Sequence, residues 1–130
     1  MVILKRFLSI AFVIVMIMLV VYGIVPKNKI NSSDEVKLIH TDDEQDIQVV
    51  LPDDEASKIR DILDGKIYLL FPGTPACGFL LCHGFSIGNT FYAVAIDTCG
   101  TIMNCSSDRF FDVSEKEINY IHSLFEKYVR

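Results

Sequence analysis

The sequence predicts an α+β fold in which an N-terminal transmembrane helix is followed by a small antiparallel sheet domain with two helices packed on it. Three observations predict this architecture. The chain begins with a long uncharged apolar run, continues with short apolar segments separated by turn residues, and contains two segments with apolar residues at helical spacing. Hairpin-like strands with two dispersed helices are typical of α+β rather than of a parallel α/β sheet.

The uncharged run extends from Phe7 to Val25 and is about as long as the hydrocarbon core of a bilayer is thick. Lys5 and Arg6 precede it, and the positive-inside rule places that end in the cytoplasm. A cleaved signal peptide is the alternative, but the run is too long and no pair of small residues marks a cleavage site. We therefore expect a single-pass signal anchor in the cell membrane.

This topology divides the chain into three parts. Residues 1–25 are predicted to be the anchor, which contacts the lipid bilayer through residues 7–25. Residues 26–34 are polar and rich in turn residues, and they read as a linker. Residues 35–130 form the predicted extracytoplasmic domain, which is long enough for one small core.

The domain is acidic. From Asn31 onward it has eight Lys or Arg and seventeen Asp or Glu, a net charge of −9. The electrostatic field of such a negative charge repels nucleic acid and anionic lipid headgroups, so neither is expected as a partner of the domain. The acidic run from Asp42 to Asp46 lacks the glycine and the closing glutamate of a calcium loop.

Short alternating segments predict the strands. The clearest local signal is Gly88-Asn89, a two-residue hairpin turn between Phe79–Ile87 and Thr90–Ile96. Pairing across this turn gathers one continuous apolar face. The facing pairs are then Phe85 with Tyr92, His83 with Val94, and Leu81 with Ile96. The other predicted strands are 36–40, 47–51, 67–71, 101–104 and 109–113.

Two helices complete the prediction. The first opens with Pro52-Asp53-Asp54-Glu55 and ends at Gly65. Its three carboxylates are favourable at the positive N-terminal end of a helix. The second opens with a capping box formed by Ser114 and Glu117. Each carries an apolar stripe, which we assign to the core. The stripes are Ala56, Ile59, Ile62 and Leu63 in the first helix and Ile118, Ile121, Leu124, Phe125 and Tyr128 in the second.

Four cysteines stand at positions 77, 82, 99 and 105. Outside the membrane an even count favours disulfides, and the spacing lacks the tight knuckle of a zinc ribbon. The hairpin brings Cys77 and Cys99 near each other, although the simple register points them to opposite faces unless a bulge intervenes. Cys82 and Cys105 can bond if their strands are neighbours; with a strand between them they remain free thiols.

The pattern from Cys77-Gly78-Phe79 through Ala95-Ile96-Asp97-Thr98-Cys99 to the capping box at Ser114 resembles uncharacterised small membrane-anchored proteins of Gram-positive bacteria. The resemblance covers about residues 47–130. It implies a bacterial origin and a bond between Cys77 and Cys99, but no activity. Cys82 and Cys105 are not part of the shared pattern.

No catalytic, cofactor or metal site is predicted. His40, His83 and His122 are the candidate bases, and each reads as a structural or surface histidine. No phosphate loop, nucleophile elbow or metalloprotease motif is present in the sequence. Two function classes follow: a membrane-tethered, non-enzymatic module that binds a protein or envelope component, or a small thiol-redox or metal-handling protein that uses the four cysteines.

Overall fold

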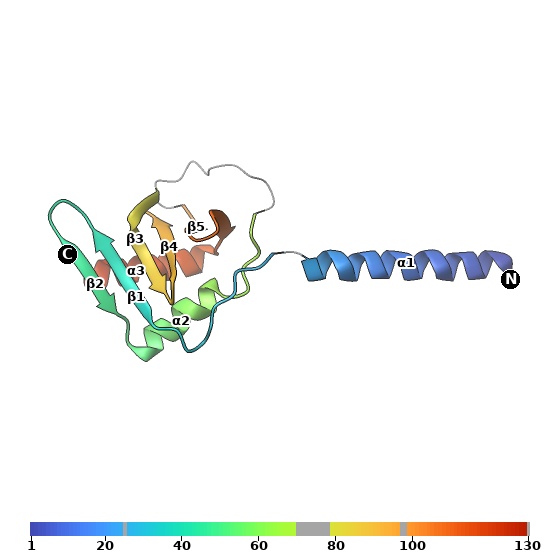
Figure 1. Ribbon diagram of the computed structural model, residues 1–130, viewed down its shortest axis with the longest axis horizontal. Helices are drawn as coiled ribbons and strands as arrows, with labels where there is room; N and C mark the ends of the chain where they lie inside the picture. Colours follow the sequence, from blue (N-terminus) through green and yellow to red (C-terminus); the bar gives the residue numbers. More distant parts are fainter. Residues whose placement is uncertain (25, 70–78, 97–98, 130) are drawn as a thin grey trace.

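The computed structural model describes residues 1–24, 26–69, 79–96 and 99–129. Its first helix, α1 (Val2–Ile24), stands apart from the domain (Figure 1). The stretch Val2–Val21 is long and apolar enough to cross a membrane, and none of it is buried. Because a core helix would be covered by the domain, α1 has the character of a membrane anchor or a signal sequence.

The domain is an α+β fold built on one six-stranded sheet, which confirms the predicted class. The strand order is β2-β1-β3-β4-β5-β6, and every neighbouring pair is antiparallel. The strands are β1 (Val36–Thr41), β2 (Asp46–Val50), β3 (Phe79–Ile87), β4 (Thr90–Ala95), β5 (Thr101–Asn104) and β6 (Arg109–Asp112). The helix α2 (Asp53–Leu63) lies between β2 and β3 in the chain, and α3 (Glu115–Tyr128) follows β6.

One predicted strand is wrong in its described part. Among residues 67–69, Ile67 makes only an isolated bridge, to Lys27. Tyr68 N–H donates to Pro26 O at 3.1 Å, whereas Leu69 N–H donates to Phe110 O at 2.8 Å. The segment is therefore shared between two different neighbours, and no continuous ladder with either can form. The remaining residues of the prediction, 70 and 71, lie outside the described ranges.

The central hairpin follows the predicted register only near its turn. Ile87 pairs with Thr90 and Phe85 with Tyr92, and Gly88 has a φ of 58° as a tight hairpin turn requires. Between Gly84 and Phe79 the register shifts, so Phe79 pairs with Ala95. The predicted pairs His83 with Val94 and Leu81 with Ile96 belong to the uninterrupted register, and this irregularity replaces it.

Gly84 marks the start of the irregularity because the two backbones come very close there. A Cβ built on Gly84 would lie 1.9 Å from Tyr92 O. No side chain tolerates that distance, and the atom it meets is backbone, which cannot turn away. The glycine thus permits the strand to bend immediately beside His83.

Gly84→Ala is therefore expected to destabilise the domain by about 1–3 kcal/mol, the usual cost of forcing extra volume into a packed site. Urea unfolding of the full chain in detergent, followed by circular dichroism, measures the loss. Gly65→Ala shows the cost of backbone strain without a clash, since a Cβ there meets nothing within 4 Å but a φ of +74° is strained for any side chain. A midpoint for Gly84→Ala equal to that of the unmodified chain would contradict the close approach.

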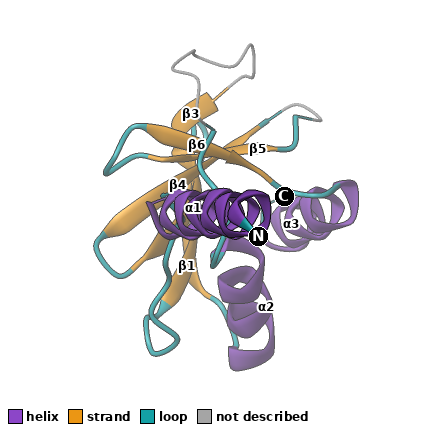
Figure 2. Cartoon of the chain, turned by 90° about the vertical axis from the view of Figure 1, so that its right-hand side faces the viewer, coloured by secondary structure: helices purple, strands orange, loops and turns teal. Residues whose placement is uncertain are grey.

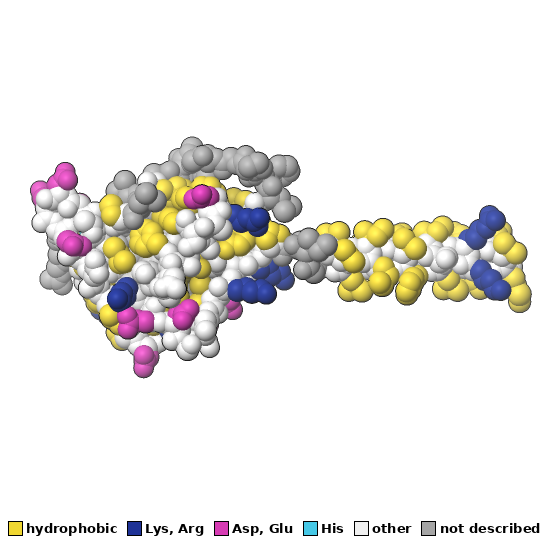
Figure 3. Space-filling view, viewed as in Figure 1, with side chains coloured by type: hydrophobic (Ala, Val, Ile, Leu, Met, Phe, Trp, Pro, Cys, Tyr) yellow, Lys and Arg dark blue, Asp and Glu magenta, His cyan; other side chains and the backbone are white. Residues whose placement is uncertain are grey.

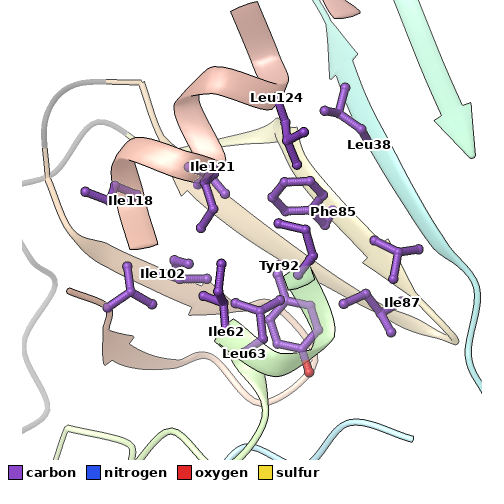
Figure 4. Packing of buried hydrophobic residues seen from close by; sticks show 14 of the residues in the cluster. Leu38, Ile62, Leu63, Phe85, Ile87, Tyr92, Ile102, Ile118, Ile121 and Leu124 are labelled. Carbon is purple, nitrogen blue, oxygen red and sulfur yellow. The ribbon is translucent and has the colours of Figure 1, made fainter. Parts of the chain in front are cut away.

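Both domain helices lie on the same side of the sheet (Figure 2). The predicted capping box at Ser114 and Glu117 is present at the start of α3. The helix α2 ends just before Gly65, whose φ is 74°. Figure 4 shows the stripes of both helices facing the inner side of the sheet. The packed residues include Ile62, Leu63, Ile118, Ile121 and Leu124 from the helices and Leu38, Phe85, Ile87, Tyr92 and Ile102 from the strands.

Two polar contacts fasten the helices to their surroundings. Glu55 of α2 is only 8% exposed and accepts hydrogen bonds from Lys127 Nζ at 3.1 Å and from Tyr128 Oη. Lys66, just after α2, donates to Glu117 Oε1 at 2.7 Å. These bonds connect α2 and the residues after it to both ends of α3.

Residues 26–34, predicted from their composition to be a linker, include one residue, Asn28, that is buried against the domain. Asn28 is 1% exposed, and its Nδ2 donates to Leu63 O at 2.8 Å. Its Oδ1 accepts from Tyr68 Oη at 2.8 Å and from Tyr92 Oη at 2.9 Å. A buried amide with all its groups paired is a packing element, so the folded domain begins almost directly after α1.

Candidate functional site

A groove lies beside α3 in the described part of the domain. It has a volume of about 540 Å³ and runs between α3 and the outer end of the β3–β4 hairpin. Among the lining residues of α3, Asn119, His122 and Phe125 are three positions apart and Glu126 is four positions after His122, so they share one helix face. We call this cavity the His83 groove; it is lined by His83, Ile96, Asn119, His122, Phe125, Glu126 and Val129.

The lining combines apolar and polar groups. Ile96 is 56% exposed and forms part of the wall. Glu126 is exposed and brings a carboxylate. His122 Nε2 is buried without a hydrogen-bond partner among the described residues. A polar atom in this state would gain a partner from a bound ligand.

His83 is held in place from two sides. Its ring stacks on Phe125, with centroids 4.0 Å apart and planes at 29°. Its Nδ1 lies 2.9 Å from His40 Nδ1, because antiparallel pairing sets His40 of β1 opposite His83 of β3. His40 Nε2 in turn lies 3.0 Å from Asp42 Oδ2. Three side chains from two strands and one turn thus form a chain of hydrogen bonds that ends at the groove.

The hydrogen-bond pattern assigns the protons. Asp42 is an acceptor, so His40 donates from Nε2; in the tautomer in which His40 Nδ1 carries no proton, that atom accepts from His83 Nδ1–H. His83 Nε2 is left as an acceptor. Burial, followed by the nearby His40 and His122, lowers the pKa of His83 to about 4. At neutral pH the groove therefore contains an uncharged imidazole.

The acidic turn is occupied by this network. Asp42 Oδ1 accepts from the backbone N–H groups of Glu44 and Gln45, both at 2.8 Å. The hydrogen bond from His40, and then these two amides, lower the pKa of Asp42 to about 2. Its carboxylate is thus committed to shaping the turn rather than to binding a cation.

The depressed pKa of His83 predicts a pH-dependent stability. Between pH 6.5 and about 4 the unfolded chain binds a proton at this histidine and the folded chain does not. The contribution of His83 to the free energy of unfolding is thus fully present above pH 6.5, and about 3 kcal/mol is lost as the pH drops through this window. Urea unfolding of the full chain at a series of pH values measures the effect.

His83→Phe is the matched control, because it keeps an aromatic ring against Phe125 and removes the titrating group. The fall in stability between pH 6.5 and 4 should be smaller in this variant. An identical slope in both proteins would assign the pH dependence to other groups.

Of the predicted disulfide residues, Cys82 and Cys105 are free thiols. Cys82 belongs to β3 and Cys105 follows β5, with β4 between them. This is the arrangement in which the two are about two strand spacings apart and do not bond. Cys77 lies outside the described residues, so its bond with Cys99 stays a prediction.

The sequence alone did not single out the His83 groove. Each histidine was assigned a structural or surface position, and the three are separated by 43 and 39 positions in the sequence, from His40 to His83 and from His83 to His122. The one available signal was that His83 and Phe85 share the apolar face of a strand, which places the imidazole at the edge of the core. The pairing of β1 with β3, which unites His40 and His83, had no local sequence signal.

Within the described part of the chain, no group of three or more His, Cys, Asp or Glu is placed to hold a metal ion. The hydrogen bonds described for Thr41, Thr101 and Cys105 go to Asp46, Asp112 and the backbone of Met103 rather than to a histidine. The described residues of the groove thus form a recess that contains hydrogen-bond acceptors. Comparison with known proteins found no matching family model, curated protein or solved structure.

Proposed function

We propose that this chain is a single-pass membrane protein whose N-terminus is cytoplasmic and whose domain is an extracytoplasmic, non-enzymatic binding module. Its ligand is a cationic side chain, Lys or Arg, presented by a protein or another envelope component. The observation that carries the proposal is the His83 groove, in which apolar walls and hydrogen-bond acceptors meet in one recess.

The groove suits a side chain that has an apolar stem and a cationic end. Ile96 and Val129 offer apolar surface for the methylene stem of a Lys or Arg. Glu126 supplies the opposite charge, and neutral His83 does not repel a cation above a pH of about 4. The net charge of −9 from Asn31 onward would steer a basic ligand towards the domain.

Catalysis is less well supported by the same residues. The order Asp42, His40, His83 places a carboxylate behind an imidazole, as an activating relay does. The relay, however, ends at a histidine whose pKa of about 4 makes it a weak base near neutral pH.

The thiol-redox and metal-handling alternative also finds little support among the described thiols. Burial raises the pKa of Cys105, which disfavours the reactive thiolate. Cys82 and Cys105 are not bonded to each other. For an extracytoplasmic domain we retain the predicted disulfide between Cys77 and Cys99 as a structural bond.

A peptide titration tests the binding proposal. The full chain in detergent micelles is titrated with a lysine-rich peptide and, separately, with a peptide in which every Lys is replaced by Gln. The lysine peptide should bind and the glutamine peptide should not. Glu126→Gln should weaken binding by about two- to fivefold, which corresponds to the free energy of one exposed ion pair.

Glu115→Gln is the matched control. Glu115 is also exposed and also on α3, but it does not line the groove. Glu115→Gln removes the same negative charge as Glu126→Gln and should leave the affinity nearly unchanged. Equal weakening by both variants would show that the peptide binds through overall charge, and the groove would lose its assigned role.

A further inference from the structure

The chain between α1 and the domain is very short. α1 ends at Ile24, and Pro26 O already accepts from Tyr68 N–H at 3.1 Å. Lys27 then forms a bridge with Ile67. Since one residue spans at most about 3.6 Å, Ile67 stays within a short distance of the end of α1.

Two large apolar side chains are exposed at this junction. Ile67 is 53% exposed and Leu69 is 46% exposed, whereas Tyr68 between them is 8% exposed. Beyond α1, the only other described large apolar side chains with such exposure are Val50 and Ile96. Ile96 belongs to the His83 groove, so the two junction residues are a separate pair.

Basic side chains surround this pair. Lys27, Lys29 and Arg109 are exposed, and the guanidinium of Arg109 lies 5.6 Å from the centroid of the Tyr68 ring. Figure 3 shows dark-blue groups gathered where the chain passes from α1 to the domain. The nearby Asp64 accepts a hydrogen bond from Ile30 N–H at 2.8 Å, while Asp108 precedes Arg109 on the exposed surface.

We propose that this junction surface, formed by Lys27, Lys29, Ile67, Leu69 and Arg109, docks on the phospholipid headgroups of the bilayer that α1 crosses. The inference rests on the membrane anchor of the proposed function, and it is independent of the His83 groove. The occupant is the lipid surface because the tether leaves the junction no room to move far from it.

The chemistry of the surface matches the headgroup region. Lys and Arg are attracted to phosphate and anionic headgroups, and apolar side chains enter the boundary between headgroups and acyl chains. The local charge is thus opposite to that of the domain as a whole. An anionic bilayer surface would repel the acidic remainder of the domain and turn that part away from the membrane. This orientation favours docking through the junction surface.

Tryptophan fluorescence tests the docking. The chain contains no tryptophan, so Ile67→Trp or Leu69→Trp introduces a single emitter at an exposed position. Each full-length variant is reconstituted in phosphatidylcholine vesicles whose acyl chains are brominated near the headgroup. Both variants should show blue-shifted emission and strong quenching. Adding phosphatidylglycerol should increase the quenching, and Lys27→Gln with Lys29→Gln should reduce that increase.

Two further variants make the outcomes distinct. Val50→Trp places an equally exposed emitter on β2, which lies across the domain from α1 (Figure 1), and it should remain unquenched. Phe12→Trp reports on α1 and should be quenched by bromines deep in the acyl chains. If Phe12→Trp were quenched but Ile67→Trp and Leu69→Trp were quenched no more than Val50→Trp, the docking would be overturned and the anchor would stand. Unquenched Phe12→Trp would overturn both.

Discussion

Replacing Phe125 with alanine is expected to destabilise the domain by about 3–5 kcal/mol, the range found for deleting a buried aromatic ring. Phe125 is 6% exposed and stacks on His83 at a centroid distance of 4.0 Å. Its ring also packs on Phe85 at 5.3 Å. The truncation would leave a cavity between α3 and the sheet and would remove the support that holds His83. Thermal or urea unfolding of the full chain in detergent measures the loss.

Glu126→Ala is the control on the same helix, because Glu126 is exposed and its truncation should change stability by no more than about 0.5 kcal/mol. A loss of that size for Phe125→Ala would mean that the ring contributes to a surface rather than to the core. The same variant should also weaken binding of the lysine-rich peptide, since Phe125 lines the His83 groove.

Asn28→Ala should cost about 2–4 kcal/mol, although position 28 lies in a polar segment next to the anchor. The side chain is fully buried and bonds Leu63 O, Tyr68 Oη and Tyr92 Oη. Its removal leaves these groups without this partner in a site closed to water, and each orphaned group costs about 1–3 kcal/mol. The terms are not additive because the groups share one network.

Lys29→Ala is the matched control for stability, since Lys29 is an exposed neighbour in the same segment. Unfolding of both variants in parallel separates the buried network from a general effect of altering the segment. If Asn28→Ala unfolded at the same urea concentration as Lys29→Ala, the segment would be a free linker, as its composition suggested.

The elements that sequence predicted well are those set by local chemistry. The Gly88 turn, the capping box at Ser114 and Glu117, and the stop at Gly65 each depend on the conformational preference or hydrogen bonding of a few adjacent residues. The stripe of α3 depends on helical periodicity, which spacing alone reveals. These signals sufficed for the α+β class.

The structure differs from the sequence-based prediction where two segments distant in the sequence meet. The simple register of β3 with β4 is interrupted between Phe79 and Gly84, and at Gly84 the two backbones approach too closely for a side chain. The strand expected at 67–71 is, in its described part, divided between Pro26 and Phe110, which lie 84 positions apart. Neither neighbour can be identified from the segment itself.

The sequence by itself determined the apolar helix α1, the acidic composition of the domain and its α+β class, because length, charge and periodicity are properties of the chain alone. Only the tertiary structure brought His40 to His83, buried Asn28 among two tyrosines and gathered basic residues beside Ile67. Net charge sums over the whole domain, whereas a ligand or a membrane meets one local surface. Which side chains share that surface depends on long-range pairing, for which no short stretch of sequence carries the signal.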